Sequence, residues 1–206
     1  MLRIAVLGAA GRMGRAVLSC VFEADDLALA GAVIEPSDRL LGRDAAELVG
    51  MDAVGVPLTD ERKQALHSAQ AAIDFTLPSA TEANLKACIE SGTALVIGTT
   101  GLEDRQRKAM EKAASEIPIV YARNMSVGVN VFMDLVGRTA RALGDGYDVE
   151  IIEAHHRYKV DAPSGTALAI AERIAEAKGR KLDELAVYGR HGRTGPRVPG
   201  TIGFAV

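Results

Sequence analysis

Residues 3–14 read Arg-Ile-Ala-Val-Leu-Gly-Ala-Ala-Gly-Arg-Met-Gly, an apolar run that leads directly into three spaced glycines. The apolar run predicts a buried strand, and residues 11–22 carry a helical pattern with small residues on the inner face. Glycines between such a strand and helix let the chain turn tightly and bring its backbone close to a pyrophosphate. The helix start adds free N–H groups and the positive end of a dipole. This stretch predicts a strand–turn–helix unit that holds a dinucleotide.

A carboxylate in the expected place supports this interpretation. The GxxGxxG spacing differs from GxGxxG and is weak evidence alone, but Glu35 follows the second predicted strand (27–34), 21 residues beyond Gly14. A carboxylate there can accept hydrogen bonds from a ribose diol. Pro36 leaves no arginine next to Glu35 for a 2′-phosphate, although Arg39 is near, so the sequence favours NADH over NADPH. The alternative is an ordinary turn with a solvated Glu35.

Strand and helix patterns alternate through the first 125 residues. Further strands are predicted at 71–75, 94–97 and 117–121, separated by helices at 60–68, 79–91 and 102–115. Strands that are apolar almost throughout indicate a parallel sheet covered on both faces, and right-handed crossovers then give an α/β, Rossmann-type, doubly wound sheet.

Three loops follow strands of this predicted sheet, at 74–76, 98–101 and 122–125. Ligands of doubly wound folds bind outside the carboxyl ends of the strands, where all three loops would lie. Each loop by itself is more typical of a plain turn. Their common edge predicts a ligand site.

The pattern changes near residue 126, and we place a domain boundary there. Residues 1–126 form the predicted dinucleotide-binding domain, and residues 127–206 a predicted α+β domain for substrate binding and oligomerisation. The second domain should hold a helix at 127–143, a strand at 148–157 and a helix at 164–178, followed by a short apolar run at 201–206.

Composition narrows the function classes. A net charge of −3 argues against general binding to nucleic acid or to an acidic membrane surface. No stretch reaches the ~20 apolar residues of a membrane span, and the first strand is too short for a signal peptide, so we predict a cytoplasmic protein. No HxxxH or Cys/His spacing indicates a metal site, and no GxSxG elbow indicates a hydrolase.

The stretch from 150 to 168 combines proton donors with an anion site. On a strand, His155, Arg157 and Lys159 would share one face, and His156 and Tyr158 the other. His155 and Lys159 would then stand about 13 Å apart at ~3.3 Å per residue. If both act on one small ring, the chain must bend after Arg157.

Ser164-Gly165-Thr166 follows this predicted strand and is typical of a capped helix start, whose free N–H groups bind carboxylates well. A plain N-cap without a ligand is the alternative. The cations upstream favour the carboxylate site.

Five segments in order resemble the dihydrodipicolinate reductase family over essentially the whole chain. They are GAAGRMG at 8–14, GTTG at 98–101, NMSVGVN at 124–130, EAHHRYKVDAPSGT at 153–166 and VPGTIGF at 198–204. The resemblance implies a homotetramer that uses NADH or NADPH to reduce a cyclic imine dicarboxylate, derived from 4-hydroxy-tetrahydrodipicolinate, to tetrahydrodipicolinate in diaminopimelate and lysine biosynthesis.

The resemblance also implies roles for individual residues. The proton-handling pair would be His155 and Lys159, the substrate contacts His156, Gly165 and Thr166, and no metal is implied. The predicted cofactor contacts are Gly8, Ala9, Ala10, Gly11, Arg12, Met13, Glu35, Gly98, Thr99, Thr100, Ala122, Arg123, Asn124 and Met125.

The chain departs from the family at its end. Family members continue for several tens of residues beyond the GTIGF segment, whereas this sequence stops at Val206, so we expect it to be truncated. Two other functions remain open: a different NAD(P)-dependent dehydrogenase, or a non-catalytic NAD(H)-binding module.

Overall fold

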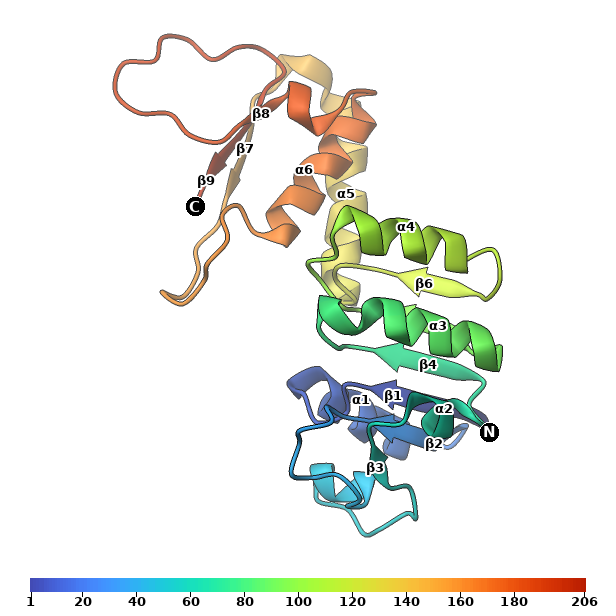
Figure 1. Ribbon diagram of the computed structural model, residues 1–206. Coiled ribbons are helices and arrows are strands. Elements are labelled where there is room, and N and C mark those ends of the chain that lie inside the picture. Colours follow the sequence, from blue (N-terminus) through green and yellow to red (C-terminus); the bar gives the residue numbers. More distant parts are fainter. The chain divides into compact units, whose positions relative to one another are not determined.

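The computed structural model describes residues 1–206 and divides them into two compact units, Met1–Ala122 and Arg123–Val206 (Figure 1). We refer to them as the first and second unit, and describe each by itself.

The first unit is built on a six-stranded parallel sheet with strand order β3-β2-β1-β4-β5-β6. This order confirms the predicted doubly wound α/β fold. The strands are β1 (Leu2–Leu7), β2 (Leu27–Val33), β3 (Leu58–Thr59), β4 (Ala71–Asp74), β5 (Ala94–Ile97) and β6 (Ile119–Tyr121).

Helices cover both faces of this sheet. They are α1 (Arg12–Glu23), α2 (Arg62–Leu66), α3 (Thr81–Ser91) and α4 (Asp104–Ala113), with 3₁₀ turns η1 (Ala45–Val49) and η2 (Pro78–Ala80). In β1, Ile4 and Val6 belong to the core packed under α1, while Ala5 and Leu7 belong to the core under α2 and α3. Because both sets are buried, the strand reads as a continuous apolar run.

The edge strand β3 was not predicted from the sequence. It contains only Leu58 and Thr59, which is too short to show a period, and it exists through its parallel pairing with Ala32 and Val33 of β2. This pairing depends on tertiary structure and leaves no local pattern.

The second unit has a three-stranded parallel sheet with strand order β7-β9-β8. Its strands are β7 (Val149–Ile152), β8 (Ala186–Val187) and β9 (Ile202–Ala205), and its helices are α5 (Val127–Leu143) and α6 (Gly165–Ala177), with 3₁₀ turns η3 (Gly144–Gly146) and η4 (Leu182–Glu184). Apolar side chains of α6 pack against β9 and the residues before β8, which gives this unit its own core.

The predicted strand at 148–157 is wrong in its second half. β7 ends at Ile152, and a loop runs from Glu153 to the start of α6. The Glu153 side chain turns toward Ser164, and Lys159 N donates a hydrogen bond to His156 O at 3.2 Å. The predicted alternation of His155 and His156 on opposite strand faces therefore does not occur.

No helix has both the length and the apolar character that crossing a membrane requires.

Candidate active site

The loops after β1 and β4 meet at the point where the strand order of the first unit reverses. From β1 the sheet grows outward through β2 and β3 on one side, and through β4, β5 and β6 on the other. In doubly wound folds a ligand binds in the crevice outside the carboxyl ends of such strands. The loops at 8–14 and 74–76 thus stand where a nucleotide is expected.

Close backbone packing fixes the glycine-rich turn. Gly8 has φ +83°, a conformation that side chains disfavour. A Cβ added at Gly14 would lie only 2.1 Å from Gly8 O and 2.7 Å from Ala9 Cα. The last glycine therefore lets α1 pack directly on the turn.

The start of α1 presents open amides. Its N-cap residue, Gly11, has no capping side chain, and the first turn contains no acidic residue. The side chain of Arg15 connects the turn to η1, since it donates to Ala10 O at 3.0 Å and to Leu48 O at 2.7 Å. Free N–H groups beside glycines can donate hydrogen bonds to phosphate oxygens, so these residues fit a pyrophosphate.

A buried carboxylate ties the loops after β4 and β5 together. Asp74, which is fully buried, accepts hydrogen bonds from Thr76 N at 2.8 Å, Thr76 Oγ1 at 2.6 Å and Thr99 Oγ1 at 3.2 Å. Asn84 on α3 donates to its other oxygen at 2.9 Å. Asn84 was not predicted as a site residue, because one asparagine within a helical pattern gives no local signal of the buried carboxylate that it contacts.

Phe75 and Gly98 also join these two loops. A Cβ at Gly98 would lie 2.1 Å from the Phe75 ring, so the ring packs directly on the glycine. Of the predicted cofactor residues in this loop, Thr99 is buried in the Asp74 network and Thr100 is exposed.

The remaining predicted cofactor residues are spread over both units. Glu35 is exposed just after β2. Ala122 N donates to Ile97 O in the first unit, whereas Arg123 belongs to the second, where it pairs with Glu172 at 3.3 Å. Asn124 accepts a hydrogen bond from Ser126 N, next to the start of α5. The structure groups Gly8–Met13 with Gly98–Thr100 in one unit but does not group Arg123–Met125 with them.

The start of α6 is a second helix end with free amides, although a side chain caps one of its other amides. Ser164 is the N-cap, and its hydroxyl accepts from Ala167 N at 3.1 Å. Residues Gly165 and Thr166 precede that bond, so their amides remain available for an anion.

Glu153 holds this helix end to the loop that carries the histidines. Its carboxylate accepts hydrogen bonds from Ser164 N at 2.7 Å and from the Ser164 hydroxyl, and one of its oxygens lies 2.8 Å from His155 Nε2. Burial opposes ionisation of Glu153, but these hydrogen bonds outweigh it and lower its pKa to about 2. Glu153 lies within the 153–166 segment that resembles the family, but no role was predicted for it from the sequence.

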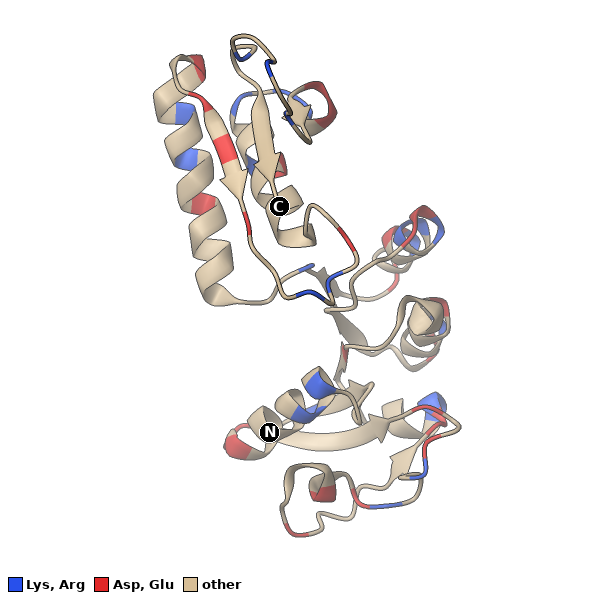
Figure 2. Ribbon diagram, turned by 90° about the vertical axis from the view of Figure 1, so that its left-hand side faces the viewer, with Lys and Arg blue, Asp and Glu red and all other residues tan.

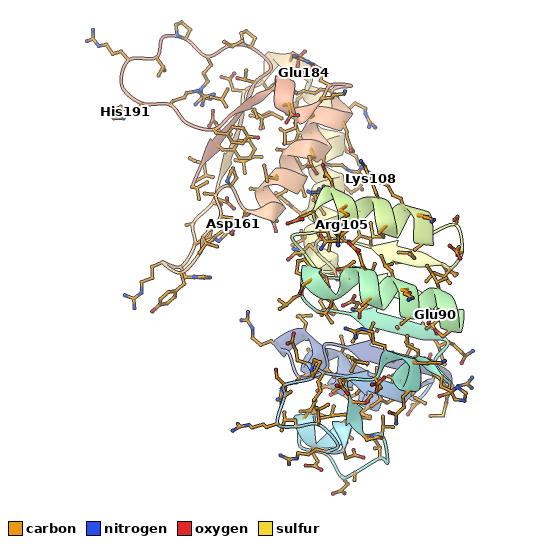
Figure 3. All side chains as sticks on the ribbon, viewed as in Figure 1. Glu90, Arg105, Lys108, Asp161, Glu184 and His191 are labelled. Atoms are coloured by element: carbon orange, nitrogen blue, oxygen red, sulfur yellow. The ribbon has the colours of Figure 1, made fainter.

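The other cations of the loop lie near its tip, where Figure 2 shows Lys and Arg together. Lys159 Nζ lies 2.7 Å from Asp161 Oδ1, and the hydrogen bond from Lys159 lowers the pKa of Asp161 (labelled in Figure 3). His156 Nδ1 accepts from Tyr158 N at 3.2 Å. The structure thus places His155, His156 and Lys159 on one loop that returns to the start of α6.

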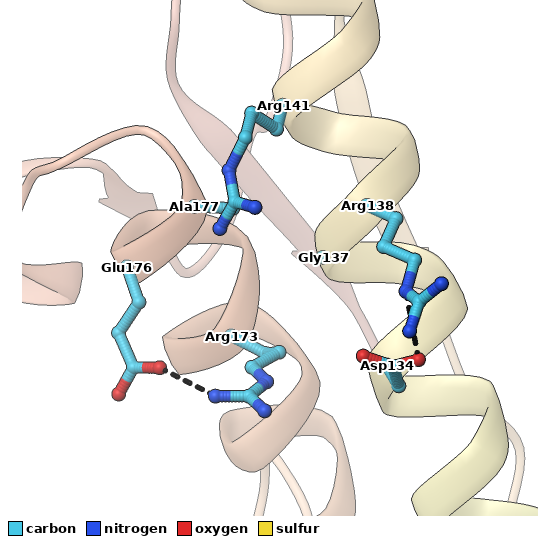
Figure 4. Close-up of a pocket in the computed structure, with 7 residues that line it drawn as sticks. All are labelled: Asp134, Gly137, Arg138, Arg141, Arg173, Glu176 and Ala177. Atoms are coloured by element: carbon cyan, nitrogen blue, oxygen red, sulfur yellow. Dashed lines mark hydrogen bonds and ion pairs between the residues drawn. The ribbon is translucent and has the colours of Figure 1, made fainter.

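A groove between α5 and α6 contains none of the predicted site residues (Figure 4). Its volume is about 520 Å³, and three arginines line it. Arg138 pairs with Asp134 at 2.9 Å and Arg173 with Glu176 at 3.0 Å, so carboxylates already balance two of the three charges.

Comparison with known proteins matches both units to one family. The family model described as "Dihydrodipicolinate reductase, N-terminus" matches residues 2–125, and that described as "Dihydrodipicolinate reductase, C-terminus" matches residues 128–206.

Individual relatives agree with this assignment. The chain is 55% identical over 202 residues to a 4-hydroxy-tetrahydrodipicolinate reductase of Alkalilimnicola ehrlichii, covering 98% of this chain and 76% of that protein. It is 52% identical to the protein of that name in Acinetobacter baumannii, covering 98% and 74%. A dipicolinate-bound dihydrodipicolinate reductase from Paenisporosarcina sp. TG-14 has the same fold, with a TM-score of 0.68, 24% identity, and coverage of 100% of this chain and 78% of that one. The chain therefore belongs to the dihydrodipicolinate reductase family.

Proposed function

We propose that this protein reduces the cyclic imine derived from 4-hydroxy-tetrahydrodipicolinate to tetrahydrodipicolinate, with NAD(P)H as the hydride donor, in diaminopimelate and lysine biosynthesis. The observation that carries the proposal is the loop from Glu153 to Thr166, which joins an imidazole, an ammonium and an open helix start within one unit. The names of the relatives and both family models support the same reaction.

The first unit would bind the cofactor, which supplies a hydride when bound. The amides at the start of α1 and the residues Gly8–Met13 would hold the pyrophosphate, and Glu35 the adenosine ribose. Gly98–Thr100, of which Thr99 is bonded to Asp74, and Ala122 at the end of the first unit would flank the nicotinamide. The family resemblance gives the same role to Arg123–Met125, which belong to the second unit.

The second unit would bind the doubly negative substrate. The amides of Gly165 and Thr166 would receive one carboxylate, and His156 would contact the substrate. Binding the ring in a fixed orientation lowers the entropic part of the barrier.

The reaction consumes one hydride and one proton and releases one water from the 4-hydroxy compound. Electron density builds on the ring as hydride adds to a conjugated carbon, and an acid must discharge it. We assign that proton to Lys159, whose ammonium is held by Asp161, and we assign stabilisation of the charge or relay of the proton to His155.

An absorbance assay tests the proposal. The chain is incubated with NADH and 4-hydroxy-tetrahydrodipicolinate, and oxidation of NADH is followed against controls that contain hydroxy or amino acids instead. We expect oxidation with the dicarboxylate only. Turnover of a control substrate would identify another dehydrogenase, and NADH binding without any turnover would favour a non-catalytic module.

Three finer assignments concern the preferred cofactor, the assembly and the cellular location. Pro36 beside Glu35 supports NADH as the preferred cofactor. The homotetramer implied by the family resemblance and the cytoplasmic location stay predictions; sedimentation of the purified chain measures the first.

A further inference from the structure

We propose that Glu153 is a positioning residue that selects which ring nitrogen of His155 faces the substrate. This inference rests on the proposed function, because it assigns a task to a residue of the same site. Glu153 belongs to neither the predicted catalytic pair nor the predicted substrate contacts.

Both oxygens of the Glu153 carboxylate have partners. One oxygen accepts from Ser164 N at 2.7 Å, and the other lies 2.8 Å from His155 Nε2 and receives the Ser164 hydroxyl. The Glu153 side chain is 12% exposed and that of His155 is 31% exposed. The carboxylate is therefore mostly shielded, while part of the imidazole remains accessible.

An ionised carboxylate can only accept hydrogen bonds. Burial raises the pKa of Glu153, but the hydrogen bonds from the Ser164 hydroxyl and amide, followed by the smaller effect of His155, lower it to about 2 and keep the carboxylate ionised at neutral pH. The imidazole nitrogen that faces it must then carry the hydrogen. Nε2–H is fixed on Glu153, and Nδ1 is left as the nitrogen that can exchange a proton or a hydrogen bond with the substrate.

Ser164 links this arrangement to the carboxylate site. Its hydroxyl donates to Glu153 and accepts from Ala167 N, and its own amide donates to Glu153 as well. The imidazole is thus attached, through one carboxylate, to the residue that precedes Gly165 and Thr166. Outer hydrogen-bond partners of this kind typically orient an imidazole and set its tautomer.

Nitrogen NMR of the full chain tests the proposal directly. The protein is labelled with ¹⁵N-histidine, the His155 signals are assigned by comparison with a His155→Gln variant, and spectra are recorded at about pH 8.5, well above the usual histidine range. We expect neutral His155 as the Nε2–H tautomer. The Nδ1–H tautomer in the unaltered protein would overturn the proposal, even if the variants below failed to fold.

Glu153→Gln sharpens the test. Its amide oxygen can still accept from Ser164 N, but its NH₂ group then faces His155 and needs an acceptor there. We expect the ring to change to the Nδ1–H tautomer, and kcat to fall about 100-fold while the KM for NADH stays unchanged. A tautomer or a kcat equal to that of the unaltered protein would refute the assignment.

Glu176→Gln is the matched control. It removes the same charge from an exposed position on α6, where the carboxylate pairs with Arg173. We expect the His155 tautomer and kcat to stay as they are. A change as large as that in Glu153→Gln would mean that net charge, not position, is responsible, and would overturn the proposal.

The two proposals fail separately. Absence of turnover by the unaltered chain with 4-hydroxy-tetrahydrodipicolinate would end the proposed function, while the Nε2–H tautomer would still support the role of Glu153 in placing the ring. Normal turnover with the Nδ1–H tautomer would retain the function and remove the role of Glu153.

Discussion

Two helix starts in this protein offer amides to an anion, and they are built in opposite ways. At α1 no side chain caps the helix, and the shape of the turn comes from glycines packed against backbone, above all Gly14 against Gly8. At α6 the helix is capped by Ser164, and side chains hold the adjoining loop in place through Glu153. Backbone packing makes the first site, and side-chain hydrogen bonds make the second.

Gly14→Ala should have the largest effect of these substitutions, because it disrupts the backbone packing at the start of α1. In Gly14→Ala the added Cβ would meet Gly8 O at 2.1 Å, and backbone on both sides cannot yield easily. We expect a loss of about 3 kcal/mol or more in the free energy of unfolding and no measurable NADH binding. Thermal unfolding and NADH titration measure both.

Gly165→Ala is the matched control at the other helix start. A Cβ there has nothing within 4 Å, and alanine favours a helix. We expect stability equal to or above that of the unaltered chain. If both alanine variants lost stability alike, the contrast between the two helix starts would be wrong.

Removal of the proposed proton donor at the α6 site should impair catalysis without unfolding the chain. Lys159→Ala removes the proposed proton donor from an exposed loop, so we expect kcat to fall about 100-fold or more with NADH affinity unchanged. Steady-state kinetics and NADH titration separate these quantities. Activity equal to that of the unaltered chain would remove Lys159 from the mechanism.

The difference between the two helix starts also explains which features can be predicted from the sequence and which cannot. Glycine spacing and apolar strands are local and follow from sterics, so the order of the large elements and the position of the turn were predicted correctly. Residues 153–157 were predicted as strand because they directly continue the apolar run at 149–152 and no turn residue interrupts them; such a stretch looks the same whether or not a partner strand exists. The bond that decides it joins Glu153 to Ser164, 11 residues later, and no period encodes such a contact.

Acidification should reduce the stability of the side-chain-built site, because Glu153 is then protonated. The pKa of Glu153 is lowered in the folded chain, so its ionised form stabilises the fold above the ordinary value of 4.5, and this contribution is lost as the pH falls toward about 2. We expect the unaltered chain to exceed Glu153→Gln in unfolding free energy on the order of 2 kcal/mol at pH 6, with the gap closing between pH 4.5 and 2.5. Urea unfolding across that range measures the gap, and a gap independent of pH would contradict the role of the charge.

The smallest expected effect concerns the preference between NADH and NADPH, which side chains at the edge of the backbone-built site determine. Glu35 is exposed beside Pro36, and Arg39, three residues after Pro36, is exposed as well. An arginine at position 36 could pair with a 2′-phosphate, whereas the glycine turn would bind the pyrophosphate of either cofactor equally. We therefore expect Pro36→Arg to raise kcat/KM for NADPH relative to NADH by roughly 10-fold, about 1.4 kcal/mol, without changing kcat. Pro36→Ala, which adds no charge, should leave the ratio within about twofold; an equal shift in both variants would mean that the proline's backbone constraint, and not the missing cation, sets the preference.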